Sequence, residues 1–359
     1  MPGLWNKDAY AFKNLYERHG GFKTPVYKIK VGSRDLNDDL GLYADGIEIS
    51  QTVKDSSGMC KFTVKNAYDI KARKFDEKIK ENFPLGKNVE ARLGYGQPKV
   101  MFKGFVSDVS FSFSQGEQPS VSIACLDVRA LMKQGRLNAS MTVSSFPVIA
   151  MDILRRYACM SNLNVTYFDV WNVFEEFRQN ASDFNYIYNY GQKRGYEFFV
   201  LGEDVYFIKK WLNLTPVTTL EWGEGLISFS RNYSYNATNV KGALSGMLSA
   251  LPFTVSLPFL NAYPAENPNA NIQTHPDTSD SKNALDLAAI MVNYGIKTLT
   301  DSAGGSVSCV GLPEITPARF IKLKNLDADF LDRSYYIEEA THKFSSSGYT
   351  TDFNITSEL

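Results

Sequence analysis

Apolar and polar residues alternate with a period of two in two long stretches of the chain. The alternating segments are 26–31, 47–50, 62–64, 89–93, 105–113, 121–123, 218–235, 320–323, 335–342 and 349–356. A period of two places the apolar side chains on one face of a strand, as in a half-buried sheet. The pattern therefore predicts a first β-domain at 25–143 and a second at 212–359.

Between the two β-rich stretches the apolar spacing becomes helical. Apolar residues over 146–157 recur on one helical face. A second helix is expected over 183–193 with Gly195 as its C-cap, followed by a hairpin at 196–208. These elements predict a small α+β domain at 144–211.

Three further segments stand outside this pattern. An N-terminal extension at 1–24 carries a predicted amphipathic helix at 5–18, which either packs on its own domain or docks on a neighbouring subunit. The charged segment 71–82 is interpreted as a solvated short helix over a barrel end, not as a basic binding patch. A long loop at 246–281 is expected to be functional or disordered, and a helix at 283–294 follows it.

The two β-rich stretches repeat each other at a nearly constant offset. The corresponding segments are 89–93 and 321–324 at an offset of 232, 105–114 and 336–345 at 231, and Ile123 and Ile355 at 232. Any two hairpins share some alternation, but three matches in chain order at one offset favour a true structural repeat. The expected fold is mainly β with an α+β insert: two similar β-barrels flank a small α+β domain.

Composition narrows the class of protein. The 359 residues include 38 Lys plus Arg and 39 Asp plus Glu, for a formal net charge of −1, which argues against a nucleic-acid binder. The most apolar stretch, 247–263, is shorter than the about 20 residues of a spanning helix and contains two prolines. The N-terminus lacks the apolar core of a signal peptide. We therefore expect a soluble chain with no membrane-spanning segment.

The chain contains few residues suited to acid–base or metal chemistry. The three histidines are His19, His275 and His342, and the four cysteines are Cys60, Cys125, Cys159 and Cys309. None has metal-ligand spacing, and the thiols are interpreted as reduced, buried small hydrophobes. A Cys309–His342 pair across a sheet is conceivable, but no motif flanks either residue.

Other candidate motifs are equally weak. Gly304-Gly305 lacks the lysine of a phosphate loop. The local acidic groups are Glu175-Glu176 and Asp327, Asp329 and Asp332, and the second group, between two predicted strands, is interpreted as a solvated turn. The sequence thus predicts no catalytic, cofactor-binding or metal-binding residue, no cofactor and no enzyme.

Two stretches resemble a known family. The run from Gln179 to Ile187 (QNASDFNYI), with Gly195-Tyr196-Glu197-Phe198 after it, resembles the "Q-x-x-S-D" signature of the late control gene D proteins, the baseplate hubs of contractile-tailed phages. This family is also similar to the hub half of type VI secretion VgrG spike proteins. The segments 311–323 and 336–342 resemble its closing barrel. Pro317-Ala318 departs from the usual Pro-Gly, which puts a tight turn in doubt.

The resemblance implies a role in particle assembly. Hub proteins of this family form homotrimers, in which six barrels join a six-fold tail tube to a three-fold spike. A separate central spike protein, a tail tube protein, other baseplate proteins and a tape measure are the partners implied, with no nucleic-acid specificity. The expected location is the tail baseplate of a virion or injection particle, assembled in the bacterial cytoplasm. The long loop could line or plug the channel, or decorate the outside.

Other functions remain open at the level of sequence. A host-surface module could bind glycans through aromatic residues, but the four tryptophans, Trp5, Trp171, Trp211 and Trp222, are spread along the chain. A second alternative, a tip protein of a non-contractile tail, is a variant of the hub hypothesis. A peptidoglycan hydrolase is less well supported, because it needs a catalytic constellation.

Overall fold

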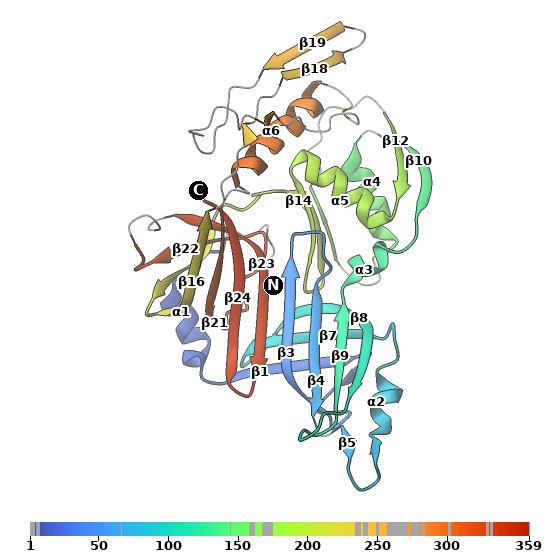
Figure 1. Ribbon diagram of the computed structural model, residues 1–359, viewed down its shortest axis with the longest axis vertical. Helices are drawn as coiled ribbons and strands as arrows, with labels where there is room; N and C mark the ends of the chain where they lie inside the picture. The colour runs from blue at the N-terminus through green and yellow to red at the C-terminus, as the bar shows by residue number, and fades with distance from the viewer. Residues whose placement is uncertain are drawn as a thin grey trace.

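The computed structural model contains two β-barrels side by side, with an α+β domain and a long helix over one end (Figure 1). It describes residues 4, 8–65, 67–143, 145–157, 162–166, 175–233, 238–239, 243–248, 251–256, 272–273, 281, 284–300, 303–327, 330 and 333–358. Within these ranges, no helix combines the length and apolarity needed to cross a bilayer.

The first barrel contains six main strands. In spatial order they are β1 (Pro25–Val31), β7 (Asn88–Tyr95), β8 (Lys99–Ser112), β9 (Ser120–Leu126), β4 (Met59–Lys65) and β3 (Tyr43–Thr52). Neighbours are antiparallel, and β2 (Arg34–Asp35) adds to the outer edge of β1. The inward residues of the alternating pattern, such as Ile29, Ile49 and Phe62, are fully buried in one core. Burial of this face holds the strands in register.

A small excursion covers the lower end of the first barrel in Figure 1. It comprises the two-stranded β5 (Tyr68–Asp69) and β6 (Lys74–Phe75) and the helix α2 (Glu77–Asn82). Asp76 caps α2 by accepting a hydrogen bond from the Lys78 backbone N–H, and Ile79 is fully buried in the barrel core. The charged segment is thus a short helix over a barrel end.

The second barrel is closed. Its strands in order are β15 (Pro216–Trp222), β22 (Phe320–Lys324), β23 (Ser334–Ser345), β24 (Gly348–Glu358), β21 (Ala303–Val310) and β16 (Gly225–Tyr233). A short parallel contact between β15 and β16, with Glu221 opposite Gly225 and Trp222 opposite Leu226, completes the ring of six strands. The core includes Leu220, Ile321 and Ile355.

The two barrels share one topology. Numbered by chain order within each barrel, both have the spatial order first, fourth, fifth, sixth, third, second. The strands β7, β8 and β9 correspond to β22, β23 and β24, which are the segments that repeat in the sequence. One direction differs, because β15 is parallel to β22 whereas β1 is antiparallel to β7. The prediction of two similar barrels flanking an α+β insert is confirmed.

The α+β domain begins earlier than predicted. It contains α3 (Val128–Met132), β10 (Leu137–Val143), α4 (Phe146–Arg155), β11 (Asn162–Val165), β12 (Glu175–Ala181), α5 (Asp183–Arg194), β13 (Tyr196–Leu201) and β14 (Asp204–Lys209). β10 pairs with β12, and Val128 and Met132 lie in this domain's core. The predicted boundary at 143/144 is therefore wrong: the first barrel ends with β9.

The hairpin of β13 and β14 joins the α+β domain to the second barrel. Every residue of β13 is buried. Phe198 and Val200 face the helices of the α+β core, whereas Phe199 and Leu201 pack with Phe320 of β22 and its neighbours. A strand buried on both faces has a continuous apolar run instead of alternation.

The segment predicted as a structureless loop contains strands. Short strands β17 (Thr238–Asn239), β18 (Ala243–Leu248), β19 (Leu251–Ser256) and β20 (Ile272–Gln273) precede the helix α6 (Ala284–Thr300). β18 and β19 form an antiparallel hairpin, which corrects the loop prediction; 257–271 and 274–280 lie outside the described residues. α6 is anchored to α5 by an ion pair from Arg194 to Asp286.

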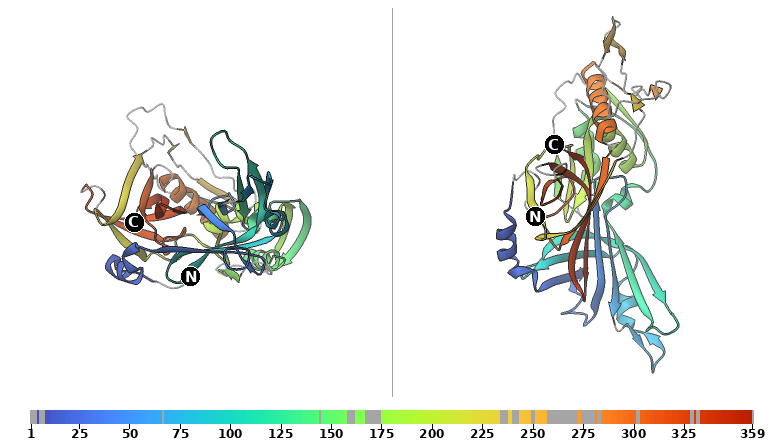
Figure 2. Two further views of the ribbon diagram at one scale, coloured as in Figure 1. Left: turned by 90° about the horizontal axis from the view of Figure 1, so that it is seen from below. Right: turned by 60° about the vertical axis from the view of Figure 1, so that its left-hand side comes forward.

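The N-terminal extension packs on the second barrel of its own chain. Its helix α1 (Phe12–Arg18) is shorter than predicted, and the 3-10 turn η1 (Gly20–Phe22) follows it. Leu15 is fully buried with Leu220 in the core of the second barrel, and the Tyr10 N–H donates to the Val217 carbonyl at 2.9 Å. Figure 2 shows α1 beside this barrel. Leu15 is thus covered within the chain, as the first alternative expects, whereas Tyr16 of the predicted face is 48% exposed.

Candidate functional site

The junction between the barrels is a continuous sheet. β24 occupies one edge of β23 along nearly its whole length. The other edge pairs with β22 over residues 334–336 and with β3 of the first barrel over residues 339–344. Ser50 and Thr341 lie opposite each other there, with their hydroxyl oxygens 3.0 Å apart. Backbone hydrogen bonds therefore fix how one barrel sits on the other.

The tip of the β23–β24 hairpin fills a gap in the first barrel. β1 and β3 are the end strands of the first barrel and do not pair with each other in the described sheet. Phe344 packs edge-on against Tyr27 of β1, with ring centroids 5.2 Å apart, and Tyr349 lies in the first-barrel core. The first barrel is thus completed by a hairpin that belongs to the second.

A buried carboxylate ties three parts of the chain together. The Glu314 side chain is fully buried, His19 Nε2 lies 3.1 Å from its Oε2, and Lys99 Nζ lies 2.5 Å from its Oε1. Burial would raise the pKa of Glu314, but the His19 hydrogen bond and the Lys99 charge outweigh it and hold this pKa at about 2. The carboxylate acts as a structural ion at neutral pH.

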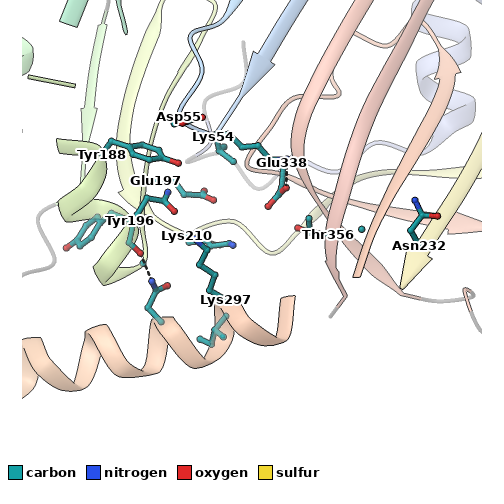
Figure 3. A pocket seen from close by; sticks show the side chains of 16 residues that line it. Lys54, Asp55, Tyr188, Tyr196, Glu197, Lys210, Asn232, Lys297, Glu338 and Thr356 are labelled. Carbon is teal, nitrogen blue, oxygen red and sulfur yellow. Dashed lines mark hydrogen bonds and ion pairs between the residues drawn. The ribbon is translucent and has the colours of Figure 1, made fainter. Parts of the chain in front are cut away.

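A polar cavity of about 680 Å³ lies where α5, α6 and the two barrels meet (Figure 3). Its walls carry both signs of charge: the lysines are Lys54, Lys210 and Lys297, and the carboxylates are Asp55, Glu197 and Glu338. Lys54 Nζ pairs with Glu338 Oε2 at 3.1 Å across the barrel junction. Because both signs of charge line the cavity, its charges favour neither an anionic nor a cationic ligand.

Glu197 is the most perturbed acid in this cavity. It is buried and accepts a hydrogen bond from the Tyr336 hydroxyl. Burial raises the pKa of Glu197 to about 7, although the Lys210 charge and the Tyr336 hydrogen bond act in the opposite direction. Near neutral pH the group is therefore divided between its neutral and charged forms at the interface of the α+β domain with the second barrel.

The structure does not bring Cys309 and His342 together. Both face Thr351 of β24 in register, from strands on its two sides, so a whole strand separates them. His342 Nε2 donates to the Ile315 carbonyl at 3.1 Å and Nδ1 accepts from the Tyr349 hydroxyl at 2.8 Å. Burial lowers the pKa of His342 to about 4 and raises that of Cys309 well above its usual range. The imidazole of His342 is neutral and hydrogen-bonded at both nitrogens, and the thiol of Cys309 is protonated. The two side chains therefore form no nucleophile–base pair.

The remaining residues singled out in the sequence are dispersed. His19 contacts Glu314, and Glu176 contacts Arg178 and Ser140. Cys60 and Cys125 are buried, free and opposite each other on β4 and β9. The residues outside the described ranges are Trp5, Cys159, Trp171, His275, Asp329 and Asp332. In the rest of the chain, no group of three His, Cys, Asp or Glu side chains could hold a metal ion.

The "Q-x-x-S-D" stretch is a helix-capping motif. Ser182 is the N-cap of α5 and its Oγ accepts from the Asn185 N–H at 3.2 Å. Asp183 accepts hydrogen bonds from Gln179 Nε2 at 2.7 Å and from the Tyr157 hydroxyl at 2.8 Å. The motif ties β12 and α4 to the start of α5, which is a structural role.

Sequence reasoning missed Glu197, Glu314 and Tyr336, whose partners lie more than a hundred positions away. For Glu197 a signal existed, since a lone acid inside the apolar run of β13 is costly to bury without a partner. Ala318 has the left-handed φ of +64° at which the related pattern has glycine, so the turn is kept by an alanine.

The model of the family described as Alg8 N-terminal domain matches residues 23–243, more than half of the chain. The chain belongs to this family. The matched region spans the first barrel, the α+β domain and the first strands of the second barrel. No curated protein matches the chain by sequence.

Solved structures with the same fold are tail proteins and a secretion component. The 43 kDa tail protein of prophage MuSo2 from Shewanella oneidensis has a TM-score of 0.66 at 12% identity, over 92% of this chain and 98% of that one. A tail protein from Neisseria meningitidis MC58 has a TM-score of 0.64 at 10% identity, over 93% and 96%.

The E. coli c3393 protein, a component of the type VI secretion system described as structurally similar to the T4 bacteriophage tail proteins gp27 and gp5, has a TM-score of 0.56 at 13% identity. The match covers 91% of this chain and 76% of that one. The shared architecture thus extends over nearly the whole chain.

Proposed function

We propose that this chain is a structural hub of a contractile phage tail or a related injection particle, of the type of the late control gene D proteins. The observation that carries the proposal is that one chain holds two barrels of identical strand order, joined edge to edge through β3 and β23. Three such chains would present six similar barrels in a ring, which is the arrangement needed between a six-fold tube and a three-fold spike.

The similar folds of tail proteins and of a type VI secretion component support this function. The partners we propose are two further copies of the chain, a separate central spike protein, the tail tube protein, other baseplate proteins and the tape measure. The location would be the baseplate of the particle, after assembly in the bacterial cytoplasm. The proposed role is mechanical and requires no catalytic group.

The test is the native mass of the purified chain by light scattering, alone and mixed with its candidate spike protein. The subunit mass is 40.3 kDa, so a trimer is expected at about 120 kDa. A trimer, or a monomer that becomes a trimer on adding the spike protein, supports the hub. A chain that stays monomeric and binds neither the spike protein nor the tube protein contradicts the hub proposal. A cell-wall zymogram with no clearing zone is expected in the same preparation.

A further inference from the structure

The internal repeat predicts which surface of the chain meets the next copy. Inside one chain, the fifth strand of the second barrel, β23, pairs with the second strand of the first barrel, β3. The equivalent strands still available are β8, the fifth strand of the first barrel, and β16, the second strand of the second. Figure 1 shows these two strands on opposite flanks of the body formed by the barrels.

Both strands carry an edge without a neighbour in the described sheet. β7 pairs with β8 only over residues 99–105, so the same edge is open from Ser107 to Ser112, while β9 covers the other edge. β15 pairs with β16 only at Gly225 and Leu226, so that edge is open beyond them. In the intrachain junction the corresponding edges of β23 and β3 are bonded to each other. An open edge is a ready template for another strand.

Aromatic residues mark the same surfaces. Phe113 follows β8 and corresponds to Phe344 at the repeat offset of 231. Tyr27, the partner of Phe344, lies opposite Leu93 of β7. At the repeat offset of 232, Leu93 corresponds to Asn325, the residue after Lys324. Lys324 lies opposite Glu221 of β15. The residue after Glu221 is Trp222. The repeat therefore equates the contact Tyr27–Phe344 with a contact Trp222–Phe113.

These aromatic side chains are exposed in the single chain. Phe113 is 65% exposed and Trp222 is 53% exposed. Phe113 packs edge-on against Tyr68 and Phe75 at its own barrel end, with ring centroids 5.5 and 5.4 Å apart. Ile227, beside Trp222 on the open edge of β16, is 50% exposed. Large apolar side chains gathered in this way indicate a surface for a protein partner.

We infer that the tip of the β8–β9 hairpin, with Phe111 and Phe113, seats on the β15–β16 end of a second copy of this chain, against Trp222 and Ile227. The contact between copies is the counterpart of the Phe344 contact within one copy, with the difference that the β15–β16 pair closes the second barrel where the first barrel has a gap between β1 and β3. It is head-to-tail, so it closes into a ring when the rotation per copy is 120°. This surface rests on the proposed hub and gives that hub a specific interface.

Truncating the aromatic residues tests the surface. In Phe113→Ala and Trp222→Ala we expect the protein concentration at half-assembly to rise by about 30-fold or more, as for a central interface aromatic. Trp222→Phe should assemble like wild type, which separates loss of the ring from loss of folding. Val292→Ala, a control at a residue 51% exposed on α6, should leave assembly unchanged.

Cross-linking gives an independent readout. A double variant Phe113→Cys/Trp222→Cys treated with a short bismaleimide should give covalent dimers and trimers. A mixture of the two single variants should give dimers only, and each single variant alone should match the wild-type background. The native Cys60, Cys125 and Cys309 are buried, and the variants are made with Cys159 replaced by serine, which keeps that background low.

The outcomes separate this surface from the hub itself. A wild-type trimer that is unchanged by both alanine variants and yields no cross-link between positions 113 and 222 overturns the surface alone. A wild-type chain that stays monomeric with and without its spike protein overturns the hub and the surface together.

Discussion

His19 Nε2 lies 3.1 Å from Oε2 of Glu314, although 295 residues separate the two. The first belongs to the turn after α1, the second to the connection between β21 and β22, and Lys99 of β8 completes the cluster. One buried carboxylate thereby holds the N-terminal extension and both barrels in place. A single conservative substitution at Glu314 should consequently destabilise the native fold.

Glu314→Gln should lower the free energy of unfolding by about 3 kcal/mol at pH 7, because it removes the buried negative charge that pairs with Lys99. The pKa of Glu314 in the folded chain, about 2, lies below that of an unfolded chain. Its contribution is thus present above about pH 4.5 and lost as the pH falls toward 2. Urea unfolding across this range should show a steeper acid loss in wild type than in Glu314→Gln. Equal slopes would contradict the assignment.

Glu197→Gln should change the pH dependence of stability in the direction opposite to Glu314→Gln. Since burial raises the pKa of Glu197 to about 7, the folded wild-type chain loses stability as the pH rises from about 4.5 through 7. The amide keeps an acceptor for the Tyr336 hydroxyl and cannot ionise. We expect the free energy of unfolding of the variant relative to wild type to increase by about 3 kcal/mol between pH 4.5 and pH 8. Glu77→Gln, at an exposed carboxylate, serves as the matched control and should show no such trend.

His342→Phe should cost about 2 kcal/mol or more at pH 7, because the Ile315 carbonyl and the Tyr349 hydroxyl lose a buried partner. The folded pKa of His342, about 4, is below the unfolded value, so its neutral form stabilises the fold above about pH 6.5 and this contribution fades as the pH falls toward 4. Thermal unfolding at pH 5 and pH 7.5 should therefore differ less in the variant. An unchanged difference would count against the buried neutral imidazole.

The capping motif of α5 gives a graded prediction. Ser182→Ala should lower the free energy of unfolding by about 1 kcal/mol, and Ser182→Asp should restore it. Asp183→Ala should cost about 3 kcal/mol, since Gln179 and Tyr157 both lose their acceptor in a buried site. Denaturant unfolding of the three variants checks the order. Asp183→Ala no more costly than Ser182→Ala would show that the network contributes little.

Regular local patterns were readable from the sequence because they depend on neighbours along the chain. Alternation identified most barrel strands, and the glycine after α5 marked the end of that helix, with Gly195 at a φ of +72°. The offset near 232 identified the strands that occupy equivalent places in the two barrels. Burial on one face of a strand produces these signals wherever it occurs.

Contacts between distant segments were not readable. β10 pairs with β12, which places β10 in the α+β domain and not in the first barrel. The alternation of β10 is compatible with both the barrel sheet and this two-stranded sheet. The partners of Glu197 and Glu314 at the domain junctions come from elements far apart in the chain. The burial of Leu15 against Leu220 likewise depended on where α1 lies in space.

The period of each strand and the end of each helix are local properties, and they were sufficient to predict two similar β-barrels around an α+β domain. The pairing of β3 with β23, the completion of the first barrel by the tip of the second, and the exposure of Phe113 and Trp222 became visible only in the folded chain. The backbone N–H and C=O groups along a strand edge are nearly the same for every sequence. Which two edges pair therefore depends on how the rest of the chain brings them together.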